Sequence, residues 1–197
     1  MDAYLKMLLA NRAWVEEKLE LRPDFFTKSA EGQQPEFLWI GCSDSRVPAE
    51  DITGSEPGEL FVHRNIANQV QPADLNVGSV LQYAVDVLKV RHVIVCGHYL
   101  CGGMAHAMHD AVGTAVDEWL EPARQLRRRH AAELEGTTDA VRRLDRLVEL
   151  NVTAQLQNLA QTRPVTAAWA SGSPLQIHAW VYDLRNGTIR ELESRSK

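Results

Sequence analysis

The sequence predicts an α/β fold: a mostly parallel central β-sheet with an antiparallel edge strand, covered by helices, with an N-terminal helical arm. Short apolar runs alternate with helical patterns along the chain, which is typical of a parallel sheet covered on both faces. Near the end, Asn186-Gly187 separates two strand-like runs, and this pair is typical of a type I′ hairpin turn. The chain has 197 residues, of which 45% are hydrophobic, so we expect a single domain, residues 1–197.

The spacing of apolar residues and the turn signals place the elements in order. The N-terminal helix is expected to start at an Asp2 cap and to end before Pro23, because proline breaks a helix. Pro164 is expected to stop the last long helix in the same way. The predicted helices are residues 2–21, 73–89, 115–130 and 138–162, and the predicted strands are residues 36–42, 60–62, 91–96, 175–184 and 189 onward.

Charge, hydropathy and cysteine content exclude several classes of protein. Lys and Arg number 21 against 26 Asp and Glu, a net charge of −5, which disfavours nucleic acid as a partner. No uncharged stretch is apolar enough to span a membrane. The N-terminus resembles neither a signal peptide nor a transit peptide, so we expect a cytoplasmic protein. Three cysteines without an export signal favour metal or thiol chemistry over disulfides.

Two apolar strands end in residues that bind metals. The first is closed by glycine and Cys42, and the second by glycine and His98, with Cys101 three residues later. The carboxyl ends of parallel strands meet at one edge of a sheet, so these three side chains can form one coordination shell if the strands are neighbours. Three protein ligands and one open position are typical of a catalytic zinc site, and we expect one Zn²⁺ per chain. Cys96 lies inside an apolar strand and is expected in the core.

Asp44 and Arg46 follow Cys42 at alternate positions, which places them on the same side of a chain that stays extended. Asp44 can then reach the metal or its water, while Arg46 holds the carboxylate ionised with a two-pronged hydrogen bond. The metal would create the nucleophile and this pair would aim it. The alternative is a surface ion pair without a function, which the position beside Cys42 disfavours.

These residues resemble the β-class carbonic anhydrases. The resemblance rests on two motifs that agree in order and separation, Cys42-Ser-Asp44-Ser-Arg46-Val-Pro and Gly97-His98-x-x-Cys101-Gly-Gly. It implies zinc-dependent interconversion of CO₂ and bicarbonate, with the same three zinc ligands and the same carboxylate–guanidinium pair. Tyr99 stands where the family usually has Ser or Thr, so the hydrogen bonding beside the metal is open.

Other positions resemble a subclass, the bacterial allosteric enzymes. Trp39, Arg64 and Tyr182 match its non-catalytic bicarbonate site, and indole, guanidinium and phenol groups are suitable donors to such an anion. The resemblance implies an inactive form, favoured by low pH and bicarbonate, in which Asp44 leaves Arg46 and becomes the fourth zinc ligand. The alternatives are core packing for the Trp and ion pairs for the other two residues.

The resemblance also implies a substrate pocket and an assembly. A small nonpolar molecule would be surrounded by Gln33, Phe61, Ile66, Tyr83 and Gly102. The implied assembly is a homodimer or a dimer of dimers, with the N-terminal helix wrapping the partner. Two alternative functions remain: hydrolysis of carbonyl sulfide or carbon disulfide at the same metal site, and a non-catalytic protein in which Asp44 stays on zinc and the site senses bicarbonate.

Overall fold

The computed structural model describes residues 2–197, which form two compact units, one ending at Gln34 and a larger one, Pro35–Lys197. The first unit consists of the helices α1 (Ala3–Leu21) and α2 (Phe25–Ala30). The Asp2 carboxylate caps α1 by accepting a hydrogen bond from the Tyr4 N–H at 3.2 Å, which satisfies one of the free donors of the first turn. The predicted helix 2–21 is therefore confirmed to within one residue.

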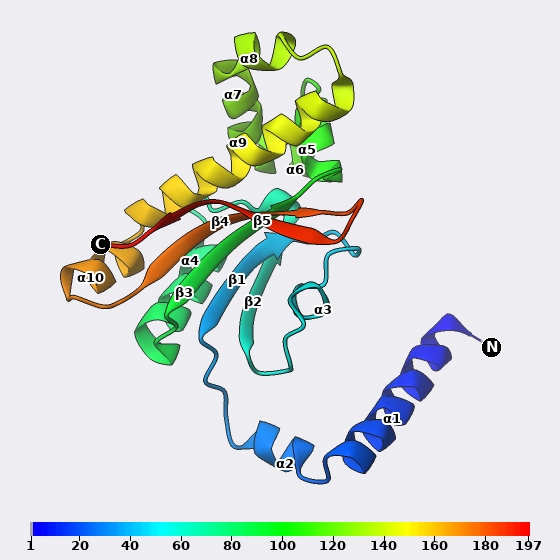
Figure 1. Ribbon diagram of the computed structural model, residues 1–197. Helices are drawn as coiled ribbons and strands as arrows, with labels where there is room; N and C mark the ends of the chain where they lie inside the picture. The colour runs from blue at the N-terminus through cyan, green and yellow to red at the C-terminus, as the bar shows by residue number, and fades with distance from the viewer. Residues whose placement is uncertain (1) are drawn as a thin grey trace. The chain divides into compact units, whose positions relative to one another are not determined.

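The larger unit is built on one five-stranded sheet with the order β2-β1-β3-β4-β5 (Figure 1). Its strands are β1 (Phe37–Cys42), β2 (Leu60–Asn65), β3 (His92–His98), β4 (Gln176–Asp183) and β5 (Thr188–Arg195). The first four strands in this order are parallel, and β5 pairs antiparallel with β4 at the edge. The predicted fold class, a mostly parallel sheet with an antiparallel edge strand, is confirmed.

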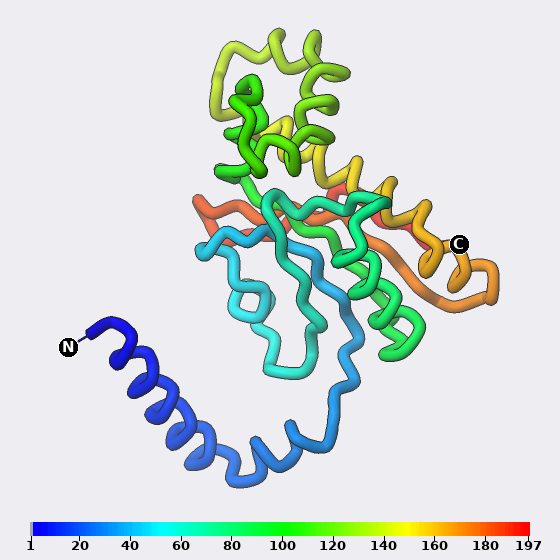
Figure 2. Tube along the Cα trace, turned by 180° about the vertical axis from the view of Figure 1, so that it is seen from behind, coloured from blue at the N-terminus to red at the C-terminus, as the bar shows by residue number. Residues whose placement is uncertain are grey.

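One face of this sheet carries the main hydrophobic core. Alternate residues of a strand point to the same face, and Leu38, Ile40, Val93 and Val95 are fully buried there. The long helix α9 (Ala140–Gln161) runs along this face (Figure 1). Beside it lie α4 (Leu75–Gln82), η2 (Tyr83–Leu88) and α10 (Arg163–Ala170), which Figure 2 shows from behind.

The opposite face carries a smaller cluster around Trp39, Ile94 and Cys96, all buried. Within Pro35–Lys197 it is covered by α3 (Ala49–Thr53), a helix of five residues, and several of its rings are only partly buried. Cys96 lies in this cluster, as the sequence predicted. This face is thus much less thickly covered than the α9 face.

Two predicted helices are interrupted. The expected helix 115–130 is divided at Leu120 into α6 (Ala115–Trp119) and α7 (Glu121–Arg129), because Pro122 cannot continue a helix and instead starts the next one. The expected helix 73–89 becomes α4 followed by the π-helical turn η2. Two further short helices are α5 (Gly102–Ala107) and α8 (Ala131–Glu135).

The C-terminal hairpin is present, but its turn differs from the predicted type I′. In the loop 184–187, only Gly187 has a positive φ, of 75°. The Asn186 side chain instead accepts hydrogen bonds from the backbone N–H and the hydroxyl of Thr188, at 3.0 and 2.7 Å. This side-chain bond replaces the left-handed backbone that a two-residue turn would need.

The described residues include no helix that combines the length and the apolar character needed to cross a membrane.

Candidate metal centre

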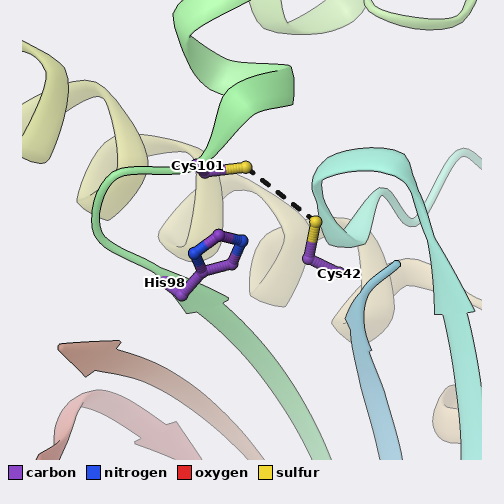
Figure 3. A group of neighbouring side chains, drawn as sticks. All are labelled: Cys42, His98 and Cys101. Atoms are coloured by element: carbon purple, nitrogen blue, oxygen red, sulfur yellow. Dashed lines mark hydrogen bonds between the residues drawn. The ribbon is translucent and has the colours of Figure 1, made fainter. Parts of the chain in front are cut away.

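The strand order brings the predicted ligands together. β1 and β3 are neighbours, so Cys42 at the end of one lies beside His98 at the end of the other. Cys101 reaches the same point from the loop before α5 (Figure 3). Their ligand atoms all lie within 4.8 Å of one another, and all three residues are buried.

The donor set fits a zinc ion. The two sulfurs are 3.9 Å apart, and tetrahedral zinc with bonds of about 2.3 Å separates two sulfurs by about 3.8 Å. His98 Nε2 is buried and has no hydrogen-bond partner. Its other nitrogen, Nδ1, lies 2.9 Å from the Tyr99 carbonyl oxygen. Because a carbonyl only accepts, Nδ1 carries the proton and Nε2 presents its lone pair to the metal position.

Two glycines of the second motif, Gly97 and Gly103, are required by close packing. A Cβ on Gly97 would lie 2.4 Å from Val152 Cγ2, and a Cβ on Gly103 would lie 2.9 Å from Ile66 Cγ2. Both contacts are shorter than any real Cβ contact. The loop between them also turns at Leu100, whose φ is 58°. Glycine therefore lets α9 and the Ile66 turn approach the loop that carries His98 and Cys101.

The three cysteines differ in acidity. A hydrogen bond with Cys101 lowers the pKa of Cys42 to about 4, against the opposing effect of burial. The same shared hydrogen bond, together with burial, raises the pKa of Cys101. Burial alone raises the pKa of Cys96. The pair thus holds a thiolate, the form that binds metals, whereas Cys96 stays a thiol.

Asp44 and Arg46 form the predicted two-pronged pair. Arg46 Nε donates to Asp44 Oδ1 at 2.9 Å and its NH2 group donates to Oδ2 at 2.7 Å. These hydrogen bonds hold the pKa of Asp44 well below its usual range. Asp44 Oδ2 lies 3.7 Å from His98 Nε2, so the carboxylate borders the metal position. The backbone does not stay extended through Arg46 as expected: it turns at Ser45 and Arg46, and the Arg46 N–H also donates to Asp44 Oδ1 at 3.0 Å.

The proposed anion residues share one face of the sheet. Arg64 pairs with Gly41 in the register, two positions after Trp39, and Tyr182 belongs to the same cluster as Trp39. A Cβ on Gly41 would lie 2.4 Å from the indole Nε1, so the indole folds over this glycine. Arg64 donates to the backbone carbonyls of Cys42, at 2.9 Å, and Asp44, at 2.5 Å.

The predicted pocket residues are placed only in part. The rings of Phe61 and Tyr83 are 5.8 Å apart, and Ile66 packs at Gly103 on the metal loop. Gln33 belongs to the N-terminal unit, whereas the other predicted pocket residues belong to the larger one.

Several residues near the metal loop were missed by the sequence reasoning. The Tyr99 hydroxyl donates to Glu149 on α9 at 2.7 Å and accepts from Arg190 on β5 at 2.7 Å, which answers the question that its unusual side chain raised. Beyond α5, the buried Asp117 pairs with the buried Arg124. These partners lie on separate helices, strands and loops. No regular spacing in the sequence relates them, so no sequence signal pointed to them.

Comparisons with known proteins agree with this geometry. A carbonic anhydrase of Emericella nidulans is 46% identical over 188 residues, covering 95% of this chain and 82% of that protein. A tetrameric β-carbonic anhydrase of Sordaria macrospora superposes with a TM-score of 0.96 at 43% identity, covering 100% of both chains. A β-carbonic anhydrase of Aspergillus fumigatus gives a TM-score of 0.93 at 43% identity, covering 98% of this chain and 91% of that one. The carbonic anhydrase family model matches residues 37–189.

The chain belongs to the β-carbonic anhydrases. It is an enzyme of this family, and its membership supports hydration of CO₂ as the activity. β-Carbonic anhydrases use zinc, the metal that the spacing of Cys42, His98 and Cys101 fits.

Proposed function

We propose that this β-carbonic anhydrase hydrates CO₂ reversibly at one zinc ion held by Cys42, His98 and Cys101, with Asp44 and Arg46 as the catalytic pair. The observation that carries the proposal is the convergence of three buried ligand atoms within 4.8 Å, beside a carboxylate oxygen 3.7 Å from His98 Nε2. When bound, zinc supplies an acidified water that can attack CO₂ near neutral pH.

Asp44 orients the nucleophile. Its carboxylate is ionised, because hydrogen bonds from Arg46 lower its pKa, and an ionised carboxylate only accepts hydrogen bonds. It would therefore accept a hydrogen bond from the O–H group of the nucleophile. A lone pair of the nucleophile's oxygen would then face the substrate. Arg46 also donates to the Leu100 carbonyl at 3.3 Å, which ties the pair to the loop that carries Cys101.

The proposed substrate site is apolar, as an uncharged linear molecule requires. The Phe61 and Tyr83 rings and the Ile66 side chain form its wall, and Gly102 adds no side chain that would narrow it. The donor role that the resemblance implies for Gln33 stays a prediction, because Gln33 belongs to the N-terminal unit. CO₂ would thus be held weakly and close to the carboxylate–guanidinium pair.

Regulation by pH and bicarbonate is the finer part of the proposal. In the closed form, Asp44 would release Arg46 and bind zinc as a fourth ligand. Two features support this: the carboxylate is already beside His98, and the Arg46 side chain is 55% exposed, so water can solvate the guanidinium once the pair separates. Low pH favours the closed form because it disfavours the hydroxide that competes with the carboxylate for the metal.

The proposed bicarbonate site has a direct connection to this gate. Arg64 donates hydrogen bonds to the carbonyls of Cys42 and Asp44. The Trp39 indole folds over Gly41, which is the register partner of Arg64. A bicarbonate ion bound by Arg64, Trp39 and Tyr182 would compete for the guanidinium and release the Asp44 backbone. Binding of the anion would thereby favour rotation of Asp44 toward the metal.

We also propose a cytoplasmic homodimer or dimer of dimers. The α1 helix supports this, because Tyr4, Met7 and Leu21 are each about 70% exposed and none of its described residues is buried. Such an apolar surface is typical of a helix that packs on another chain. A second copy of this chain is the proposed partner.

Stopped-flow CO₂ hydration by zinc-loaded protein, between about pH 6.5 and 9, tests both the activity and the gate. We expect a rate near zero at the acid end that rises more steeply than one titrating group allows. A shallow single-group rise would keep the enzyme and contradict the gate. No hydration at any pH, with zinc bound, would overturn the proposal in favour of carbonyl sulfide, carbon disulfide or a sensing role.

A further inference from the structure

The backbone carbonyl of Tyr99 orients the imidazole of the residue before it. His98 Nδ1 donates to this oxygen at 2.9 Å, while His98 Nε2 is buried without a partner and borders the metal position. The imidazole ring is rigid, so the direction of the bond from Nδ1 also sets the direction in which Nε2 presents its lone pair. The position of the Tyr99 carbonyl therefore decides where the ligand atom of His98 points.

This carbonyl belongs to a peptide group in an unfavourable conformation. The peptide joins Tyr99 to Leu100, whose φ is 58°, and left-handed backbone is unfavourable for a residue with a Cβ. The Tyr99 N–H donates to the Tyr182 carbonyl at 3.0 Å, and the Leu100 carbonyl accepts from Arg46 at 3.3 Å. Both of these bonds are made by the neighbouring peptide groups. The direction of the Tyr99 carbonyl thus depends on how firmly Tyr99 itself is held.

The Tyr99 side chain is held at its far end by two other parts of the fold. Its hydroxyl donates to Glu149 Oε1 on α9 at 2.7 Å and accepts from Arg190 on β5 at 2.7 Å. Arg190 also donates to Glu149 at 2.5 Å, and Arg146 donates to Glu149 at 3.0 Å. The ring between the hydroxyl and the backbone packs against the main core. A helix and a strand therefore fix this side chain from both sides.

We propose that Tyr99 is a positioning residue for the zinc ligand His98. Glu149 and Arg190 hold its hydroxyl, so the Tyr99 backbone stays in place and its carbonyl keeps Nε2 aimed at the metal position. This inference rests on the proposed zinc site. Tyr99 acts through the imidazole and has no contact with substrate. The hydroxyl connects α9 and β5 to one ligand of the metal.

The test compares Tyr99→Phe with the wild-type protein in two measurements that do not depend on activity. Zinc affinity is measured by competition with a chromophoric chelator, and the ligand-field bands are measured in the cobalt-substituted protein. Phenylalanine keeps the ring, and Glu149 and Arg190 keep each other as partners, so the fold should be retained. We expect zinc to bind about tenfold more weakly and the bands to shift, because the imidazole has lost its fixed direction.

Arg185→Leu is the matched control. The Arg185 guanidinium lies over the same ring, 5.0 Å from its centroid, and its ion pairs are with Asp145 and Asp183. Its loss should lower the melting temperature and leave the zinc affinity and the cobalt bands unchanged. Equal band shifts in Arg185→Leu and Tyr99→Phe would mean that any loosening of this region reaches the metal, and would overturn the role of the hydroxyl.

A second substitution tests whether the hydroxyl is the route to the metal. Arg190→Leu removes one of the two hydroxyl bonds, from a side chain that is 57% exposed, and should shift the bands less and in the same direction. In the Tyr99→Phe background it should cause no further change, because the bond that it removes is already absent. If Tyr99→Phe does not fold, Arg190→Leu alone carries the test.

The outcomes are distinguishable. Wild-type protein that binds no zinc would overturn the proposed function and this inference with it. Wild-type protein that binds zinc, with Tyr99→Phe unchanged in affinity and bands, would overturn the inference alone. So would an effect of Arg190→Leu that is as large in the Tyr99→Phe background as in the wild type.

Discussion

Two Asp-x-Arg segments of this protein have almost the same geometry in different surroundings. In Asp183–Arg185, at the end of β4, Nε donates to Oδ1 at 2.8 Å and NH2 donates to Oδ2 at 3.0 Å. In Asp44–Arg46, after β1, the corresponding distances are 2.9 and 2.7 Å. In both, the arginine N–H also donates to Oδ1. The local sequence thus builds the same two-pronged carboxylate–guanidinium pair, or fork, at two strand ends.

The difference lies in what each fork faces. The carboxylate of Asp44 borders His98 Nε2, 3.7 Å away. The guanidinium of Arg185 instead pairs with Asp145 at 2.9 Å and lies over the Tyr99 ring. The fork itself is therefore not a site. The neighbouring buried lone pair is the reason why Asp44 and Arg46 are proposed as the catalytic pair, whereas a neighbouring carboxylate and ring make the other fork a structural contact.

The largest expected effect comes from removing the two carboxylates in turn. Asp44→Ala should lower kcat/KM for CO₂ hydration by about 100-fold, because the nucleophile loses its orienting acceptor, while zinc content stays at one per chain. Asp183→Ala, the matched control, should leave kcat/KM within about twofold of wild type. Stopped-flow rates and metal analysis measure both. Full activity in Asp44→Ala, or loss of its metal, would contradict the assigned role.

A smaller effect is expected from removing the two guanidinium groups. Without Arg46, Asp44 stays ionised at pH 7 but is free to approach the metal, so Arg46→Leu should lower kcat/KM by about tenfold. The loss should shrink toward pH 9, where hydroxide competes better for the metal. Arg185→Leu should instead keep the rate and lower the melting temperature. Equal rate losses in the two variants at every pH would show that both forks act only through stability.

The comparison also shows what the sequence could predict about the site. The closeness of the predicted ligands Cys42 and His98 follows from one rule, that parallel strands end at the same edge, and the observed strand order satisfies it. The Asp44–Arg46 contact was predicted for a different reason than the one observed. Extended backbone was expected, whereas a turn stabilised by the Asp44 side chain forms the pair. A two-residue spacing brings the side chains together in both geometries, so the prediction was right on contact and wrong on backbone.

Other parts of the site had no local signal. Tyr99 meets Glu149 across 50 residues and Arg190 across 91 residues. Such contacts depend on how α9 is placed on the sheet and on which strand β5 joins, and helical periodicity reports only which positions face inward. The left-handed Leu100 is a stronger case, since leucine has a high helix propensity and nothing in its neighbours predicts a positive φ.

The smallest expected effect concerns Asp145, the neighbour that distinguishes the second fork. Burial raises the pKa of its carboxyl, although the hydrogen bond from Arg185 opposes this. A carboxyl with a raised folded-state pKa costs stability above the pH at which the unfolded group titrates, about pH 4, and the cost disappears below it. Asp145→Asn should therefore raise the melting temperature at pH 7, by no more than about 2 °C, and the difference should shrink as the pH approaches 4. Calorimetry at both pH values measures it. A lower melting temperature at pH 7 would mean that the ion pair with Arg185 outweighs the cost of burial, and the second fork would then contribute to stability through this carboxylate.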